Sequence, residues 1–141
     1  MTPDQLFQLS SPIALLGWIA LAASPLVPRA AQIVSAAAIP LLLSVAYSGL
    51  VLAFWAGAPG GFSSLPEVQA LFTNPQIALA GWLHYLAFDL FLGAWATRTA
   101  RAEGISHWLL LPCLVLTFLF GPAGFLAIAI LRFSLVGKIL P

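Results

Sequence analysis

Charged residues are so rare in this chain that they divide it into long uncharged stretches. The gaps without Asp, Glu, Lys or Arg run from Asp4 to Arg29, from Arg29 to Glu67, from Glu67 to Asp89 and from Glu103 to Arg132. Charged residues make up 6% of the chain and hydrophobic residues 62%, whereas a soluble domain has about 25% and roughly 45–50%. So little charge cannot cover a surface that faces water, so we infer an integral membrane protein.

The overall charge and the absent motifs exclude several classes of function. A net charge of +1 without a basic cluster excludes a nucleic-acid partner. The single cysteine, Cys113, cannot form an internal disulfide, and two histidines far apart in sequence make a poor metal site. The chain has no phosphate-binding glycine loop, dinucleotide fingerprint, HExxH or CxxC motif. We therefore expect no metal and no cofactor, and any chemistry should be acid–base chemistry or binding.

The uncharged stretches predict four membrane-spanning helices, because a helix needs about 20 mostly apolar residues to cross the hydrocarbon core. Their approximate ranges are 6–27, 31–56, 76–97 and 107–135, within a single domain, 1–141. The first stretch has a signal peptide as its alternative, but its start lacks the positive charge of such peptides. The predicted fold class is an all-α bundle of four transmembrane helices.

The connections carry the residues that begin and end helices. Asn74-Pro75 predicts a helix start, with Asn as the N-cap and Pro at the first helical position. The polar stretch 98–104 predicts a short turn. A short helix lying at the membrane interface is predicted between spans two and three, because four apolar residues share one helical face there: Leu65, Val68, Leu71 and Phe72.

The distribution of basic residues predicts an orientation. Four crossings place both termini on one side, and the turns after spans one and three hold Arg29, Arg98 and Arg101, against Lys138 and Arg132 on the opposite side. The positive-inside rule assigns the more basic side to the cytoplasm. We therefore expect a protein of the bacterial inner membrane with both termini on the non-cytoplasmic side.

Asp89 is the residue most informative about function, because it lies near the middle of the third span. An Asp at the centre of a membrane helix costs about 2.5–3.5 kcal/mol on insertion scales, so it should face the bundle interior. Burial there favours the protonated form unless a cation is close. One interpretation is a hydrogen-bonding strut between helices. The other is a functional group, which is the default for intramembrane ionisable residues.

The neighbours of Asp89 predict a surface for a long apolar ligand. Tyr85 and Asp89 share one helix face, one turn apart, whereas His84 is rotated from Asp89 by about 140°. His84 aligns instead with an aromatic row, namely Phe88, Phe91 and Trp95. Such a face suits an apolar ligand with a few oxygens, although rings at helical spacing more often serve packing and a lone histidine often bonds to a neighbouring helix.

The sequence Gly121-Pro122-Ala123-Gly124 interrupts the fourth span near its midpoint. Proline removes a backbone donor and clashes with the preceding turn, so the helix should kink and leave carbonyl groups free. Because spans three and four run antiparallel, the break should lie near the depth of Asp89. Non-helical backbone at that depth persists only where it is buried in protein or lines a cavity. A kink that only improves packing is the alternative.

Two further residues are candidates for contact with the same ligand. Arg132 should either extend to the lipid headgroups or reach inward toward His84 and Asp89. Tyr47 belongs to a short stripe of hydroxyl side chains on the second span. Hydroxyl groups of this kind more often join helices to one another.

Two segments resemble the signatures of a known family. Trp82–Gly93 looks like the first signature of the abscisic-acid-deficiency type membrane proteins, whose plant members are neoxanthin synthases. Leu111–Gly124, followed by Leu131-Arg132, is similar to the second. The likeness covers residues 35–133 and couples the buried His/Asp pair to the Gly-Pro-Ala-Gly break. Bacterial members match better than plant members, which carry chloroplast targeting sequence.

The resemblance implies an activity and roles for the site residues. The plant enzymes convert the epoxide violaxanthin into the allene neoxanthin, a net isomerisation. This implies an acid that protonates the epoxide oxygen and a base that removes a vinylic proton. Asp89 and His84 match the motif at those positions, with Tyr85 and Arg132 in support. The implied partner is a carotenoid or related isoprenoid, in a reaction that needs no cofactor.

Two other functions stay open at this point. The first is a non-enzymatic carotenoid- or lipid-binding subunit, either a homo-oligomer or an assembly partner of another membrane enzyme. The second is a component of proton-linked transport, with Asp89 as the proton carrier. Four helices without an internal repeat argue against a transporter that works alone.

Overall fold

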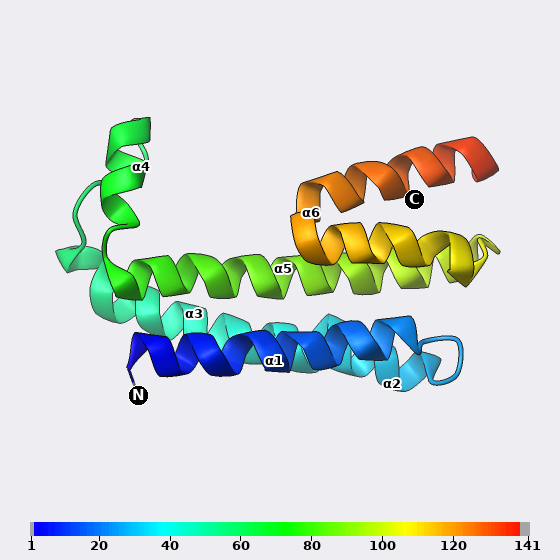
Figure 1. The fold of residues 1–141 in the computed structure, drawn as a ribbon, viewed down its shortest axis with the longest axis horizontal. Helices are drawn as coiled ribbons and strands as arrows, with labels where there is room; N and C mark the ends of the chain where they lie inside the picture. Colours follow the sequence, from blue (N-terminus) through cyan, green and yellow to red (C-terminus); the bar gives the residue numbers. More distant parts are fainter. Residues whose placement is uncertain (1, 139–141) are drawn as a thin grey trace.

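Four long apolar helical segments dominate the computed structural model, which describes residues 2–138. They are α1 (Pro3–Ala22), the continuous rod Pro28–Gly57, α5 (Pro75–Ala102) and α6 (His107–Val136). By total length and composition each could cross a membrane, and no strand occurs within residues 2–138. The prediction of an all-helical protein with four long apolar spans is therefore confirmed. Figure 1 shows α1, the second rod and α5 lying alongside one another.

The second rod is not a uniform α-helix. It consists of α2 (Pro28–Gln32), a π-helical segment η1 (Ile33–Ala38), α3 (Ile39–Phe54) and a final 3₁₀ turn η2 (Trp55–Gly57). Pro40 explains the wide turns, because proline cannot donate to the carbonyl four residues earlier and its ring clashes with that carbonyl in an α-helix. The π-helical segment directly before it gives the ring room.

Side chains at the helix starts have the roles that the sequence predicts. The Asn74 carboxamide oxygen accepts hydrogen bonds from the backbone N–H groups of Gln76 and Ile77, at 3.0 and 3.1 Å, so the predicted start of α5 is confirmed. The predicted short helix is also present, as α4 (Leu65–Leu71), with Ser64 as its N-cap. Figure 1 shows that α4 lies across the end of α5 rather than along it.

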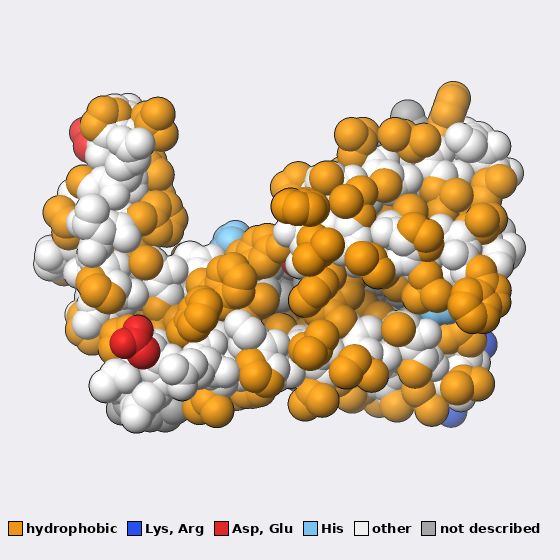
Figure 2. Space-filling model, viewed as in Figure 1, with side chains coloured by type: hydrophobic (Ala, Val, Ile, Leu, Met, Phe, Trp, Pro, Cys, Tyr) orange, Lys and Arg blue, Asp and Glu red, His pale blue; other side chains and the backbone are white. Residues whose placement is uncertain are grey.

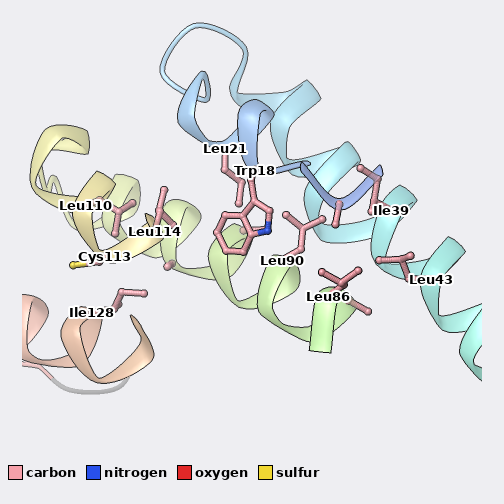
Figure 3. Close-up of a cluster of buried hydrophobic side chains, with 14 of the residues drawn as sticks. Trp18, Leu21, Ile39, Leu43, Leu86, Leu90, Leu110, Cys113, Leu114 and Ile128 are labelled. Carbon is pink, nitrogen blue, oxygen red and sulfur yellow. The ribbon is translucent and has the colours of Figure 1, made fainter. Parts of the chain in front are cut away.

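Helix α5 is the central element of the bundle. Leu90 on α5 is fully buried, and the buried apolar cluster around it includes Trp18 from α1 and Leu43 from α3 (Figure 3). Glycines permit the close approach of α1 and α5, since a Cβ at Gly17 would collide with Leu90 and one at Gly93 with the Trp18 ring. Small residues play this part in membrane helix packing. One face of α5 is thereby fixed in the core, and another is left for the candidate site.

Two helix boundaries differ from the prediction. Helix α1 ends at Ala22 rather than near residue 27, because the turn that begins at Ala23 contains apolar residues that hydropathy cannot distinguish from a span. Helix α5 continues through Arg98 and Arg101 to Ala102, so the predicted turn at 98–104 is wrong over 98–102, five of its seven residues. Arginine is a good helix former, and the chain turns only where Gly104 adopts a positive φ of 70°.

Helix α6 reverses direction instead of crossing as one kinked rod. Phe120 has a non-helical backbone, with φ −146° and ψ 59°, and the segment after it runs back toward the α5–α6 turn (Figure 1). Each arm is shorter than the about 20 residues that a crossing requires. The fourth span is thus a helical hairpin, with a first arm over 107–119 and a second arm over 121–136.

The hairpin is closed by an ion pair that joins its second arm to the α5–α6 turn. The Arg132 guanidinium donates to both carboxylate oxygens of Glu103, from Nε at 2.8 Å and from Nη2 at 2.6 Å. Arg132 is only 1% exposed and the Glu103 side chain 14%. A straight α6 would hold these residues far apart, because 25 residues from His107 to Arg132 correspond to about 37 Å of helix.

Glu103 predicts a loss of stability in acid. The hydrogen bond from Arg132, with the charges of Arg132 and Lys138, holds the pKa of Glu103 below its ordinary value of 4.5 despite the opposing effect of burial. A carboxyl with a lowered pKa stabilises the fold fully above its unfolded pKa, and this contribution is lost as the pH falls through the folded pKa. We expect the detergent unfolding midpoint to fall more steeply below about pH 4.5 in the wild type than in Glu103→Gln. Circular dichroism measures this, and an equal slope in both proteins, with Asp4→Asn as the exposed control, would contradict the assignment.

The reversal also corrects the predicted arrangement of the termini. The start of α1 and the end of α6 lie at opposite ends of the bundle (Figure 1), so the expectation that both termini share one side is wrong for this structure. The expectation failed because it counted 107–135 as a complete crossing. All five basic residues now gather at the end that contains the α1–α2 and α5–α6 turns; they are Arg29, Arg98, Arg101, Arg132 and Lys138.

Candidate functional site

The reversal in α6 leaves backbone carbonyl groups that a side chain of α5 satisfies. Pro122 has no N–H group, so the carbonyl of Phe118 lacks its helical partner, and the non-helical Phe120 removes the partner of Leu119 as well. The Tyr85 hydroxyl lies 3.0 Å from both carbonyl oxygens and donates its proton to them. Tyr85 therefore ties α5 to the break.

Removing this hydroxyl should destabilise the hairpin selectively. We expect Tyr85→Phe to lower the free energy of unfolding by about 1 kcal/mol, because two carbonyl groups lose their donor. Tyr47→Phe is the matched control, since no hydrogen bond joins the Tyr47 hydroxyl to the rest of residues 2–138. Unfolding of both variants in denaturing detergent measures the difference, and equal stability of the two variants would contradict it.

Asp89 lies one turn after Tyr85 and faces the break directly. Gly121 is buried against it, and a Cβ at Gly121 would collide with the Asp89 carboxyl. The Tyr85 hydroxyl and the backbone N–H of Gly121 are the polar groups turned toward this carboxyl. Within the described part of the chain, the buried Oδ2 atom of Asp89 has no hydrogen-bond partner. A buried oxygen without a partner is costly, so this atom is available to a ligand oxygen or a proton.

An apolar groove of about 500 Å³ opens beside this carboxyl. Its walls come from α5 and from the second arm of α6, and apart from Asp89 they consist of Phe88, Phe91, Leu92, Trp95, Gly121, Pro122 and Phe125. The rings of Trp95 and Phe125 contact each other at the groove, with centroids 6.1 Å apart and planes tilted by 50°. Figure 2 shows hydrophobic side chains over α5 and α6 beside the hollow that separates α6 from α4. The groove can therefore hold an apolar chain against a single acid.

His84 lies at one end of the same aromatic surface. Its ring stacks on Phe88, with centroids 4.7 Å apart, and lies 5.7 Å from the Tyr47 ring of α3. His84 is exposed and lies five residues before Asp89 on the same helix. Since Phe88 also lines the groove, one ligand lying along α5 can reach both the imidazole and the carboxyl.

The structure brings most of the predicted site residues together, with one exception. Tyr47, His84 and Phe88 form one cluster, and around the break lie Tyr85, Asp89, Trp95, Gly121 and Pro122. Gly124 contributes to the reversal itself, because a Cβ there would collide with the backbone of Thr117 on the first arm.

Arg132 is the exception, and both predicted positions for it are wrong. It neither extends to the surface nor aims its charge at the centre of the bundle, but pairs with Glu103 at the α5–α6 turn. Glu103 follows Asp89 by 14 residues, which is about 21 Å of helix. The guanidinium reaches the groove only indirectly, since it lies 5.7 Å from the centre of the Trp95 ring.

Sequence reasoning missed two residues of this region. Phe125 lines the groove only because α6 turns back, and Glu103 is identified as the partner of Arg132 only by the same reversal. The Gly-Pro-Ala-Gly motif would have indicated both residues if it had been interpreted as a reversal of the helix and not as a kink.

The arrangement suits acid–base chemistry on an apolar molecule. An acid in its neutral form can donate a proton to a ligand oxygen, an imidazole nearby can accept one, and aromatic faces can stabilise positive charge that develops between them. Across the described residues, no three His, Cys, Asp or Glu side chains lie close enough to hold a metal ion.

A family model matches this chain over most of its length. It is described as ABA DEFICIENT 4-like and covers residues 5–127, which include most of α1, all of α5, the His84 and Asp89 positions and the break in α6. No curated protein and no solved structure matches the chain significantly. The matched region thus contains every residue that lines the groove at Asp89, and the chain belongs to the ABA DEFICIENT 4-like family.

Proposed function

We propose that this protein acts on a carotenoid or a related long isoprenoid, as an isomerase of the neoxanthin synthase type. The observation that carries the proposal is the Asp89 carboxyl, whose buried Oδ2 has no partner within residues 2–138 and which lines an aromatic groove. Family membership supports the substrate class. In this proposal Asp89 and His84 are catalytic, Tyr47, Tyr85, Phe88 and Trp95 bind the substrate, and Arg132 holds the second arm of α6 in place.

The proposed reaction needs only protons. The neutral Asp89 acid protonates the epoxide oxygen, the carbon–oxygen bond breaks, and the positive charge spreads into the conjugated chain between the aromatic faces. His84 then removes a proton from carbon, and the electron pair of that C–H bond forms the new double bond. Substrate and product have the same atoms, so the reaction consumes no proton overall. Transfer of a proton from His84 to Asp89 then restores both groups to their starting forms.

The groove is accessible from the lipid side. Phe88 and Phe91 are 60% and 47% exposed on its wall, at a depth where a membrane surrounds the bundle. The hydrocarbon core is about 30 Å thick, comparable to an extended carotenoid, so a substrate can enter laterally without crossing water. This supports a ligand taken from the membrane.

The open groove also supports a second function, binding without conversion. A half-open apolar site can store or deliver a pigment to another membrane enzyme, with Asp89 as a hydrogen-bonding anchor. Binding and catalysis use the same residues but differ in the products that accumulate.

The test is expression in cells that make epoxide carotenoids, comparing the wild type, an empty vector and Asp89→Asn. Isomerisation predicts a new pigment of unchanged mass in the wild type alone, separated by liquid chromatography and identified by mass spectrometry. Pigment that co-purifies at fixed stoichiometry without conversion supports binding instead. Identical profiles and no bound pigment in all three would overturn both.

We also propose that the end carrying all five basic residues faces the cytoplasm of a bacterial inner membrane. Of the four acidic residues, Asp4 and Glu67 belong to α1 and α4 near the opposite end, and Asp89 lies in the middle of a span. Glu103 is thus the one acidic residue at the basic end. The positive-inside rule then places the end of α6 inside and the start of α1 outside. We expect a fluorescent reporter fused after residue 141 to be active and an alkaline phosphatase fused there to be inactive. The reverse result would overturn the orientation.

A further inference from the structure

A second cavity, of about 660 Å³, lies at the basic end of the bundle. It is lined by the α1–α2 turn, the start of the second rod, the end of α5, the α5–α6 turn and the start of α6. Its polar lining consists of Ser24, Gln32, Thr97, Arg98, Arg101 and His107. It is separate from the groove at Asp89, and the proposed isomerisation makes no use of it.

Hydrogen bonds hold one of its two arginines in place. Arg98 donates from Nη1 to the side-chain oxygen of Gln32, at 3.0 Å. The amide nitrogen of Gln32 in turn donates to the backbone carbonyl of Ala94, also at 3.0 Å. Gln32 directly precedes the π-helical segment, a feature often found at functional sites. The guanidinium is thereby oriented while its remaining N–H groups stay available.

The rest of the cavity extends this positive region. Arg101 follows Arg98 by three residues, so both side chains project from neighbouring positions on α5. The His107 ring at the cavity wall is held by its Nε2 atom, which donates to the backbone carbonyl of Ala22 at 2.9 Å. Glu103, the acid of the adjacent turn, is already paired with Arg132 and does not neutralise these arginines.

The cavity also has an apolar wall. Pro25, Ile105 and Leu110 line it beside the arginines, and Ile105 and Leu110 are buried. A forked guanidinium pair next to an apolar wall is complementary to an anionic head carrying an alkyl chain. Arginine binds phosphate oxygens through two parallel hydrogen bonds, and basic pockets between membrane helices bind anionic lipid headgroups.

We propose that this cavity binds a phosphate group that carries no compensating cation, with Arg98 and Arg101 as its ligands and the apolar wall against an attached alkyl chain. The phosphate belongs either to a membrane phospholipid or to a free phosphate compound. The proposal is independent of the function proposed for the Asp89 groove.

Native mass spectrometry of the full chain, stripped of lipid in detergent, tests the proposal. The probes are phosphatidylglycerol, phosphatidylcholine with the same acyl chains, and inorganic phosphate. We expect phosphatidylglycerol to bind at least tenfold more tightly than phosphatidylcholine. Arg101→Gln should weaken its binding several-fold, and Arg98→Gln with Arg101→Gln roughly tenfold, the scale of two exposed charge contacts.

Two variants separate a built site from general attraction to charge. Arg29→Gln removes a basic residue of the same end that does not line the cavity and should leave binding unchanged. Arg98→Lys keeps the charge but loses the fork, so it should weaken binding less than Arg98→Gln. Competition by inorganic phosphate would assign the site to a free phosphate compound, and binding of the lipid alone would assign it to a headgroup. Equal binding of the two lipids, or an equal loss in Arg29→Gln, would overturn the proposal.

Discussion

Replacing Gly124 with alanine should prevent the second arm of α6 from folding against the first. A Cβ at Gly124 would overlap the backbone of Thr117, seven residues earlier across the reversal. Side chains can move aside, but helix backbone cannot do so without losing its own hydrogen bonds. We therefore expect the substitution to cost about 3 kcal/mol of unfolding free energy, at the upper end of the range for overpacked cores. Titration with denaturing detergent measures this loss.

The only cysteine of the chain reports the opening of the hairpin independently. Cys113 lies on the first arm, is 9% exposed and belongs to the same buried cluster as Ile128 on the second arm. A maleimide should label it faster in Gly124→Ala than in the wild type, because the covering arm is displaced.

Gly49→Ala is the matched control for this experiment. Gly49 lies in α3, and a Cβ there would have no neighbour within 4 Å. Alanine favours a helix over glycine by roughly 0.5–1 kcal/mol, so this variant should be as stable as the wild type or slightly more so. Equal losses of stability in both variants, or unchanged labelling in Gly124→Ala, would show that α6 does not form the hairpin.

The long uncharged stretches were sufficient to predict the fold class. Because water is absent from the hydrocarbon core, a continuous apolar stretch of about 20 residues satisfies its backbone groups there as a helix, so the helical class follows from composition. Local chemistry also fixed the start of α5, since the Asn74 cap and the ring of Pro75 act within one turn. Tyr85 and Asp89 share a face because helical periodicity requires it.

The reversal of α6 could not be predicted in the same way. Gly121 and Pro122 show only that helical hydrogen bonds are lost and that space is available. A kinked helix and a reversed helix both meet these two conditions. The choice depends on contacts between distant residues, namely Thr117 with Gly124 and Glu103 with Arg132. Helical periodicity gives no information on such pairs. The errors about the termini, Arg132 and Phe125 all follow from this one undetermined step.

Replacing Asp89 with asparagine should separate stability from function. The buried Oδ2 has no partner within residues 2–138, so an amide of the same shape avoids the larger cost of burying an ionisable group there. We expect the free energy of unfolding to stay equal or to rise by about 1 kcal/mol. Conversion of the pigment should fall at least about 100-fold, the lower limit for the loss of a general acid.

The opposite pair of results distinguishes a strut from a functional acid. If Asp89 only joined α5 to the break, asparagine would keep part of its hydrogen bonding, stability would fall and conversion would continue. Asp4→Asn is the control, because Asp4 is exposed in the first turn of α1 and lies outside the groove. It should change conversion not at all and stability by less than about 1 kcal/mol, the size of a helix-dipole contribution. Parallel measurement of both quantities therefore decides whether the acid serves the fold or the ligand. A substitution that abolishes conversion without lowering stability shows that the native acid is kept for the ligand, at a cost to the stability of the fold.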